Sequence, residues 1–387
     1  MKPTFFFLAF VLIFMILTGV YIYFRIRPLL AQSVTWQGVL SRVGFVLVFF
    51  SFALGFLLER GGFYGLSMPF TYLGSWVLAA VFYLLIIFLA VDVIRIVNAL
   101  TFKADFLSFR YVWDDEKGKL YSLVSCIIAA VVLVCGYFNA KFPVTKYLKY
   151  ETSKAVEKNF KYVLVSDVHL GMINCDSFLE RLKDKINAEN PDFVVIAGDF
   201  FDGDPYPVIN SRAGEILKEI RTGCGIYAVN GNHEWIGNAE LADEFLKKHG
   251  VTVLRDSSAQ LPFGVTVIGR EDRSAGRRDK NGGRKPLKDI VENVSRTDYT
   301  ILLDHQPVHL EEASESGAID IELSGHTHAG AQLWPLFLIT RKIYENGFGE
   351  YRKGETDFYT TSGYGTWGPP VRTSARPEMV VIEVFKK

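Results

Sequence analysis

The distribution of hydrophobic positions divides the 387-residue chain into two parts. Four long apolar stretches stand out in the first part, at residues 4–24, 43–58, about 69–91 and 121–137. A helix needs about 20 residues, with a range of about 17–25, to cross a hydrocarbon core about 30 Å thick. The first and third stretches are long enough, and the other two lie near the lower limit between flanking charges. The pattern predicts about four transmembrane helices within residues 1–140.

From about residue 143 onward, short apolar runs alternate with longer amphipathic stretches. The runs predict strands at residues 162–166, 193–197, 225–229, 251–254, 265–268, 299–303, 319–323 and 378–385. The amphipathic stretches predict helices at residues 178–188, 213–221, 239–249 and 288–294. Residues 270–285, rich in Gly, Arg and Lys, are expected to form a solvated loop. Residues 141–387 are therefore predicted to be one α/β domain whose sheets are covered by helices.

Charge separates the two parts in the same way. The chain has 42 Lys+Arg and 42 Asp+Glu, a balance that argues against a nucleic-acid binder. Residues 1–140 hold only 10 of the basic and 6 of the acidic residues. The four cysteines follow no pattern, so the sequence encodes neither a disulfide framework nor a cysteine metal site.

An ion or proton pathway requires ionisable residues near the centres of the spans, and the predicted spans carry none there. The first part is therefore interpreted as an anchor in the lipid bilayer and not as a transporter. A cleavable signal peptide does not fit residues 4–24, because the run is long, lacks a small-residue cleavage site and is followed by further spans. Lys2 before the first span and Arg25 and Arg27 after it favour an N-terminus outside the cell. With four spans, the C-terminal domain would also be extracytoplasmic.

The candidate chemistry gathers where the predicted strands end. Of the seven histidines, five follow strands, and acidic or amide residues accompany them. These residues are Asp167, His169, Asp199, Asn232, His233, His305, His326 and His328. Ligands of open α/β sheets bind beyond the carboxyl ends of the strands, so these loops are expected to converge.

The residue types indicate what the converging loops bind. Asp, Asn and His without Cys form a mixed oxygen and nitrogen site that suits divalent Mn, Fe or Zn. Asp199 offers two carboxylate oxygens and could bridge a pair of ions. Such pairs activate a water and stabilise the oxygens of an in-line displacement at phosphorus. These residues are therefore suited to hold one divalent ion or a pair of them at the ends of the strands.

In order along the chain, Asp167-x-His169, Gly198-Asp199, Gly231-Asn-His-Glu234, His305 and Gly325-His-x-His328 resemble the motifs of the calcineurin-like metallophosphoesterase superfamily. The resemblance covers about residues 160–330. Gly203 and the segment 361–372 are similar to a membrane-associated bacterial branch, in which some relatives are sugar-nucleotide lipid pyrophosphatases. After His328, Ala331 separates Gly330 from Gln332, where the family has adjacent Gly and Gln.

The resemblance implies a four-layer α/β/β/α sandwich and a role for each motif residue. One ion would be held by Asp167, His169, Asp199 and His328. The second would be held by Asp199, Asn232, His305 and His326. His233 would lie beside the phosphate as the proton donor to the leaving oxygen, a role open to a well-placed imidazole. Arg372 is a candidate substrate contact, since arginine can bind phosphate with two hydrogen bonds.

Three function classes remain open from the sequence. The first is a membrane-anchored hydrolase of a phosphodiester or pyrophosphate bond, with a lipid or lipid-linked substrate favoured because an anchor raises the local concentration of lipids. The second is a phosphomonoesterase or phosphoprotein phosphatase on the same ligand set. The third is a non-catalytic membrane sensor, against which the complete ligand set speaks. The sequence leaves the substrate, the native metals and the oligomeric state open.

Overall fold

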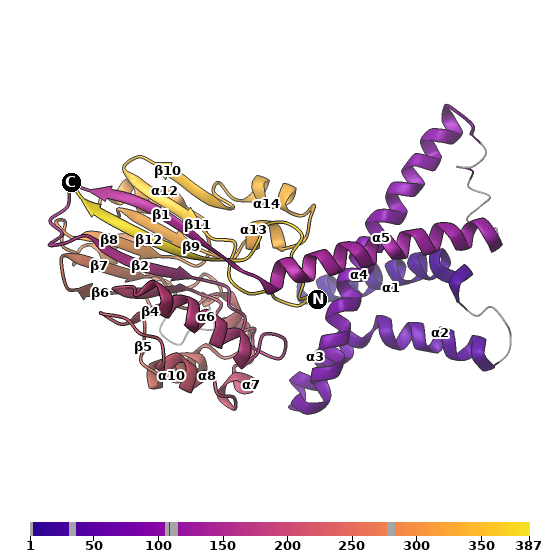
Figure 1. Cartoon of the computed structure of the whole chain (residues 1–387), viewed down its shortest axis with the longest axis horizontal. Coiled ribbons are helices and arrows are strands. Elements are labelled where there is room, and N and C mark those ends of the chain that lie inside the picture. Colours follow the sequence, from indigo (N-terminus) through magenta and orange to yellow (C-terminus); the bar gives the residue numbers. More distant parts are fainter. Residues whose placement is uncertain (1–2, 31–35, 105–107, 109–114, 277–282) are drawn as a thin grey trace. The chain divides into compact units, whose positions relative to one another are not determined.

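The computed structural model describes residues 3–30, 36–104, 108, 115–276 and 283–387, and side chains from residue 13 onward (Figure 1). The chain folds as two compact units, Met1–Gly136 and Tyr137–Lys387. The boundary between the units lies inside helix α5 (Asp115–Lys141).

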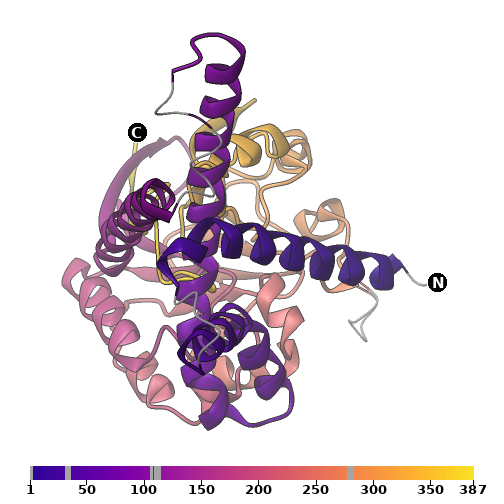
Figure 2. The ribbon, with the colours of Figure 1, turned by 90° about the vertical axis from the view of Figure 1, so that its right-hand side faces the viewer.

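The first unit is helical. Its elements are α1 (Pro3–Ile26), a 3₁₀ turn (Arg27–Leu29), α2 (Trp36–Phe49), α3 (Ser51–Arg60), α4 (Tyr64–Leu100) and most of α5. Figure 2 shows α1 as one continuous helix. Among the described residues, α4 and residues 116–141 of α5 are long and apolar enough to cross a membrane. The bent pair α2 and α3 adds a third candidate if it is one span, whereas the side chains that begin α1 lie outside the described residues.

The predicted span at residues 43–58 is not one straight helix. The structure breaks it at Phe50 into α2 and α3, which are bent by 51°. At the break, Ser51 Oγ donates to the carbonyl of Val48 at 2.6 Å, a side-chain bond that bends helices. Close packing then holds α3 against α4, because a Cβ at Gly74 would lie 2.2 Å from the backbone nitrogen of Phe52.

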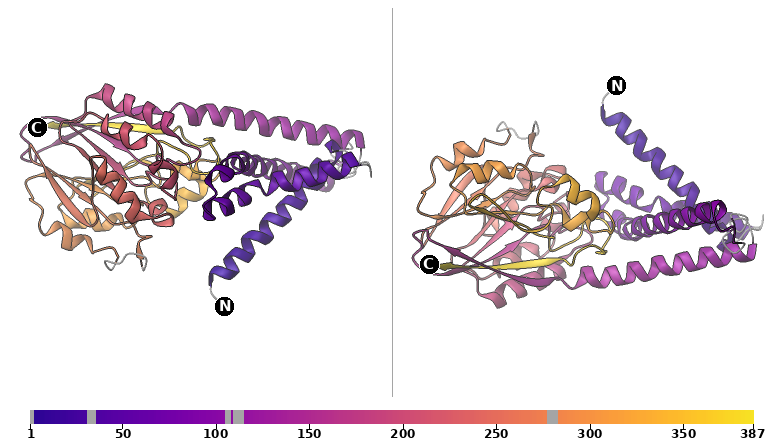
Figure 3. Two further views of the ribbon diagram at one scale, coloured as in Figure 1. Left: turned by 90° about the horizontal axis from the view of Figure 1, so that it is seen from below. Right: turned by 90° about the horizontal axis from the view of Figure 1, so that it is seen from above.

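Two six-stranded sheets build the second unit. The first sheet has the order β1-β12-β2-β3-β4-β5, with β1 parallel to β12, β12 antiparallel to β2 and the others parallel. Its strands are β1 (Val144–Thr152), β2 (Phe160–Val165), β3 (Phe193–Ala197), β4 (Ile226–Val229), β5 (Val251–Val253) and β12 (Glu378–Lys386). Figure 3 shows α5 leading into β1.

The second sheet has the order β10-β11-β9-β8-β7-β6, parallel at its centre and antiparallel at both edges. Its strands are β6 (Ser257–Leu261), β7 (Val265–Gly269), β8 (Tyr299–Leu303), β9 (Ile321–Ser324), β10 (Gly349–Lys353) and β11 (Thr356–Thr360).

Three hydrophobic cores separate four layers. The first core lies between the first sheet and helices that include α6 (Asp176–Glu189), α8 (Ala213–Lys218) and α10 (Ala239–Lys248). The second core lies between the two sheets, and the third lies between the second sheet and α11 (Leu287–Val291) and α12 (Leu310–Ser316). Helix α6 shows the basis of this packing, because its buried residues recur at helical spacing on one face. The predicted four-layer α/β/β/α sandwich is confirmed.

The predicted strands agree with the structure best in the buried centre of each sheet. Strands β3 and β8 have the predicted limits, and every residue in both is buried. The edge strand β1 and the pair β10 and β11 were not expected. Strand β1 alternates polar and apolar residues with charged side chains, so its sequence lacks the apolar run that marks a buried strand.

The expected solvated loop at residues 270–285 is wrong for its described part. The side chain of Arg270 is only 3% exposed and lies 3.1 Å from Glu312, while Arg284 forms an ion pair with Asp304. Acidic residues on neighbouring elements therefore hold these arginines inside the domain. Residues 277–282 lie outside the described residues.

Candidate metal centre

Five loops at the carboxyl ends of strands bring the predicted ligands together. The loop after β2 supplies Asp167 and His169, and the loop after β3 supplies Asp199. The loops after β4, β8 and β9 supply the rest, namely Asn232, His233, His305, His326 and His328. The parallel strand order places these loops at one edge of each sheet, as expected for an α/β ligand site.

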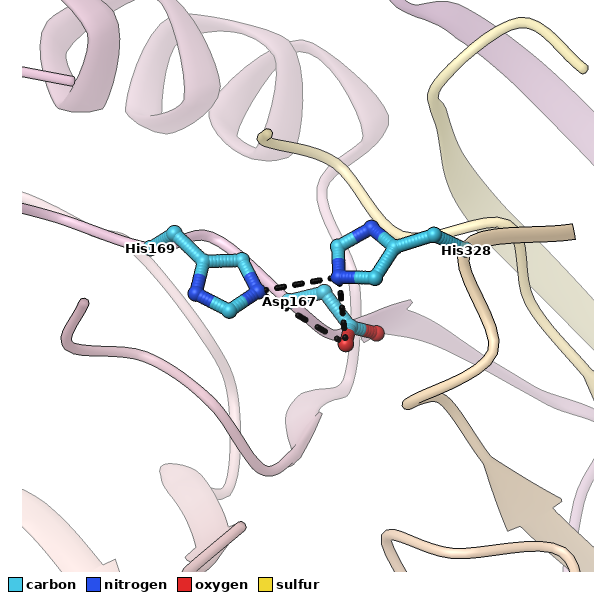
Figure 4. A group of neighbouring side chains, drawn as sticks. All are labelled: Asp167, His169 and His328. Carbon is cyan, nitrogen blue, oxygen red and sulfur yellow. Dashed lines mark hydrogen bonds and ion pairs between the residues drawn. The ribbon is translucent and has the colours of Figure 1, made fainter. Parts of the chain in front are cut away.

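The first group of ligand atoms consists of Asp167, His169 and His328 (Figure 4). Nε2 of His169 lies 3.0 Å from Nε2 of His328 and 3.9 Å from Oδ1 of Asp167. The distance from Nε2 of His328 to the same oxygen is 3.4 Å. All three residues are buried. Nε2 of His169 also lies 3.9 Å from Oδ2 of Asp199, which connects this group to the second.

The second group consists of Asp199, Asn232, His305 and His326. Nε2 of His305 lies 3.1 Å from both Oδ2 of Asp199 and Oδ1 of Asn232. Nδ1 of His326 lies 2.7 Å from the same Asn232 oxygen. Nδ1 of His305 is directed to the carbonyl of Ala197 at 2.8 Å, a contact that fixes the ring and leaves Nε2 for the site. Asp199 therefore borders both groups.

Strained backbone positions supply most of these side chains. Five of the predicted ligands have positive φ angles, a conformation that non-glycine residues rarely adopt. They are Asp167 (52°), His169 (49°), Asp199 (50°), His326 (68°) and His328 (48°). Such strain gathers at functional sites, where the surrounding structure holds it in place. Glycines permit the crowding, because a Cβ at Gly231 would lie 2.2 Å from Oδ1 of Asp199.

Glu234 connects the loops that follow β3 and β4. Its buried carboxylate accepts hydrogen bonds from the backbone amides of Gly231 (2.7 Å), Phe201 (3.0 Å) and Asp199 (3.1 Å). Burial raises the pKa of Glu234 to about 7, and the nearby negative charge of Asp199 acts in the same direction. Three residues after Gly231, this glutamate ties the β4 loop to the β3 loop.

The charges of the site favour an ionised Asp199 and a protonated His233. Burial alone would raise the pKa of Asp199, but the histidines His305 and His233 hold it well below its usual range. Burial would lower the pKa of His233, yet Asp199 and Asp202 raise it to about 9. His328 is different, because burial and the charge of Arg372 hold its pKa well below the usual value.

His233 lies beside the ligand groups and is held by a carboxylate. Its ring centroid is 4.6 Å from that of His169. Oδ1 of Asp202 lies 3.3 Å from Nδ1 of both rings, so one carboxylate orients a predicted ligand and the predicted proton donor. The side chain of His233 is 18% exposed, in contrast to the fully buried His169.

Arg372 does not occupy the place expected of a substrate contact. Its side chain is fully buried, and Nη2 lies 2.9 Å from Nδ1 of His328. Nη1 donates to the carbonyls of Ser362 at 2.6 Å and His328 at 3.2 Å. Because the guanidinium of Arg372 has no exposed surface, it holds His328 in position and does not contact a substrate directly.

Two further residues that shape the site were not predicted as such. Asn174 donates to the carbonyl oxygens of His169 and Thr366, which joins the β2 loop to the C-terminal segment. Gln332, displaced by one residue from the family pattern, donates to the carbonyls of Trp367 and Pro369. In the sequence, only their closeness to the motifs could have drawn attention to Asn174 and Gln332. Their hydrogen bonds reach the carbonyls of residues 366–369, and such long-range contacts leave no local pattern.

The residues present fit divalent metal ions. Two unexposed imidazole Nε2 atoms only 3.0 Å apart, next to a carboxylate, form an arrangement that a shared cation satisfies. The second group adds carboxylate, amide and imidazole donors. Imidazole and oxygen donors together suit Zn, Fe or Mn. The described residues thus contain groups able to hold divalent ions at the edge where the sequence predicts them.

The fold and this site define a metallophosphoesterase domain. A family model described as calcineurin-like phosphoesterase matches residues 160–330. An uncharacterized metallophosphoesterase of Aquifex aeolicus is 30% identical over 66% of this chain and 98% of its own length. The chain therefore belongs to the calcineurin-like phosphoesterase family.

Two other relatives extend beyond the domain or associate it with a membrane. An uncharacterized metallophosphoesterase of Campylobacter jejuni is 29% identical over 96% of both chains. A zebrafish (Danio rerio) protein described as a transmembrane protein with metallophosphoesterase domain is 31% identical over 67% of this chain and 62% of its own length. Together with the apolar helices α4 and α5, these relatives indicate association with a membrane.

Proposed function

We propose that this protein is a membrane-anchored hydrolase that cleaves a phosphodiester or pyrophosphate bond of a lipid or lipid-linked substrate. The observation that carries the proposal is the position of His233, next to two complete groups of metal-ligand atoms and partly exposed. Asp199 and Asp202 raise the pKa of His233 to about 9, which favours the protonated imidazole at neutral pH. A positioned imidazole of this kind can protonate the leaving oxygen of a phosphoester.

The residues of the chain divide the reaction between them. Two divalent ions, one in each ligand group, would supply Lewis acidity toward the phosphate oxygens and a water of lowered pKa. Asp199 borders both groups and would be shared between them. Asp202 holds Nδ1 of His233, which leaves the proton on Nε2 to be given to the leaving oxygen. Trp367, 40% exposed with its ring centroid 6.2 Å from that of His233, would form a wall of the substrate site.

The membrane part supports a lipid substrate. Helices that hold an enzyme in a bilayer confine it to the same surface as lipids, which raises the concentration of lipid substrates around the site. A soluble phosphoprotein gains nothing from such confinement. We propose further that the anchor crosses the membrane more than once and that the catalytic unit is extracytoplasmic, on the basis of Arg25 and Arg27 at the end of α1.

The test is Mn²⁺-dependent hydrolysis of bis-p-nitrophenyl phosphate and p-nitrophenyl phosphate by the full chain in detergent micelles. We expect preference for the diester and a loss of activity in His233→Ala, smaller on these nitrophenyl esters than the about 10²- to 10⁴-fold typical of a lost general acid, because nitrophenolate leaves readily without a proton. His309→Ala is the matched control, because the side chain of His309 is exposed and paired with Glu311, although it lies in the same loop as His305. Preference for the monoester would favour a phosphomonoesterase, and inactivity of metal-loaded protein on both compounds would favour the binding-only alternative.

A further inference from the structure

An exposed apolar surface lies directly after the His326-x-His328 loop. Five large side chains on and around α14 (Phe337–Ile343) are each 43–67% exposed. They are Trp334, Leu338, Ile339, Ile343 and Phe348, and together they are called the α14 surface. Large apolar groups gathered in this way on a folded domain mark a site of interaction and are not expected to remain in water.

The α14 surface combines these apolar groups with positive charge. None of the seven residues of α14 is buried, so the helix packs weakly on the domain beneath it. Arg341 and Lys342, in its last turn, are exposed as well. Exposed Trp, Leu and Ile interspersed with Arg and Lys are typical of segments that lie in the interface of an anionic bilayer.

The α14 surface is attached to the metal-ligand loop. A hollow of about 350 Å³ lies beneath it, lined by residues that include Ala329, Gly330, Phe337 and Arg341. The hollow thus begins at the residue that follows His328. Thr327, between the two histidines, donates through Oγ1 to the carbonyl of Gly347 at 2.7 Å. Anything that binds the α14 surface therefore lies within reach of the ligand loop.

The end of a candidate membrane helix contacts the same part of the second unit. Residues 137–141 of α5 belong to this unit, and Asn139 donates to the carbonyl of Arg372 at 2.9 Å. Arg376 donates to the carbonyl of Phe142 at 3.0 Å. Between these contacts, Ser374 and Ala375 line the hollow beneath α14. Figures 1 and 3 show α14 at the end of the unit where α5 enters.

The end of α5 indicates which level of the second unit would meet the head groups of a bilayer. The apolar stretch of α5 ends at about residue 137 and the helix at Lys141, and a spanning helix reaches the head groups where its apolar stretch ends. Phe138 and Phe142, 54% and 56% exposed, continue the apolar character at this level. The hydrogen bonds of Asn139 and Arg376 described above connect this level of α5 to residues 372–376, two of which line the hollow.

We propose that the α14 surface rests in the interfacial layer of the bilayer, with its apolar side chains among the upper acyl chains and Arg341 and Lys342 against anionic head groups. The hollow then opens toward lipid beside the metal centre. This inference relies on the membrane anchor and not on hydrolysis, so it can fail or succeed separately from the proposed function.

The test measures contact between α14 and lipid in the full chain. Ile343→Cys is introduced in a background without the four native cysteines, labelled with an environment-sensitive fluorophore and reconstituted into phosphatidylcholine–phosphatidylglycerol vesicles. Lys218→Cys is the control, an exposed position at the end of α8, which precedes the amino end of β4 and thus lies away from the site. We expect nitroxide lipids to quench the label at position 343 at least about twofold more than the label at 218.

Three outcomes separate the alternatives. Equal quenching at positions 343 and 218 overturns the proposal. A blue-shifted emission at 343 without quenching by nitroxide lipids also overturns it and assigns the surface to a protein, such as a second copy of the chain. Greater quenching that is retained in His233→Ala and reduced by charge reversal at Arg341 and Lys342 supports it. If the labelled variant does not fold, photoactivatable lipids are used with the native chain, and adducts must favour residues 334–348 over 212–221.

Discussion

Nη2 of Arg372 lies 2.9 Å from Nδ1 of His328, and Nη1 of the same guanidinium donates to the carbonyl of His328 at 3.2 Å. One fully buried arginine thus fixes both the ring and the main chain of a metal-ligand residue. Because burial opposes the charge, it lowers the pKa of Arg372 to about 10, which still leaves the group positive at neutral pH. The contact makes Arg372 a positioning residue for the metal centre.

Arg372→Met is expected to weaken metal binding more than substrate binding. Loss of a group that orients a ligand typically lowers metal affinity by about 10- to 100-fold. The Mn²⁺ dissociation constant, measured by titration calorimetry, should rise by this factor, while KM at saturating metal changes little. Arg352→Met is the control, since Arg352 is 59% exposed and pairs with Glu355 and Asp357, away from the ligand loops along the chain. A raised KM with unchanged metal affinity would instead indicate direct contact with substrate.

The pH profile of kcat should carry the signature of His233. This group acts as an acid only while protonated, so activity falls as the pH rises through its pKa of about 9. Bound divalent cations repel the imidazolium, so in the metal-loaded protein the alkaline decline is expected at or below that pH. A profile measured with His233→Gln should lack the decline. If the decline persists unchanged in the variant, another group is the acid.

The loss of activity in His233→Ala should depend on the leaving group. A nitrophenolate leaves readily without a proton, whereas an alkoxide requires one. We therefore expect the variant to lose at least about tenfold more activity on an alkyl phosphodiester than on bis-p-nitrophenyl phosphate. Rates with both substrates, each divided by the native rate, provide the comparison. Equal losses would mean that His233 positions the substrate without transferring a proton.

Glu234→Gln is expected to destabilise the second unit by about 1–3 kcal/mol, because a single amide oxygen cannot accept all three backbone hydrogen bonds.

The ionisation of Glu234 should also make the native protein lose stability as the pH rises from about 4.5 to about 7. In this window the folded carboxyl, with its raised pKa, binds a proton more tightly than the unfolded one. Thermal unfolding across this pH range checks both effects. Glu240→Gln, on the exposed side of α10, should change neither the free energy of unfolding nor its dependence on pH.

Cys175 reports the side of the membrane on which the second unit lies. This cysteine is free and exposed at the start of α6. If the unit is extracytoplasmic, a membrane-impermeant maleimide added to intact cells should label the chain, and Cys175→Ser should abolish most of the labelling. Labelling that appears only after the cells are broken would place the unit in the cytoplasm.

The site was predictable because its residues follow a simple topological rule. Each of Asp167, Asp199, Asn232, His305 and His326 comes directly after an apolar strand, and parallel strands end at the same edge of a sheet. The buried strands were marked by runs of apolar residues, such as Phe193–Ala197. Local patterns therefore sufficed to predict an α/β domain, the edge at which the candidate ligands gather and an apolar helical part, whereas the four-layer sandwich was implied by the family resemblance.

The sequence by itself determined the buried central strands, such as β3 and β8, and which residue types can bind a metal, because both depend on residue type and short-range spacing. Only the tertiary structure decided that Arg372 supports His328, that Asp202 is shared by His169 and His233, and that α2 and α3 bend at Phe50. It also decided that α5 ends beside the segment beneath α14. These relationships join groups that are distant along the chain, and hydrogen bonds and packing between such groups leave no periodic signal in the sequence.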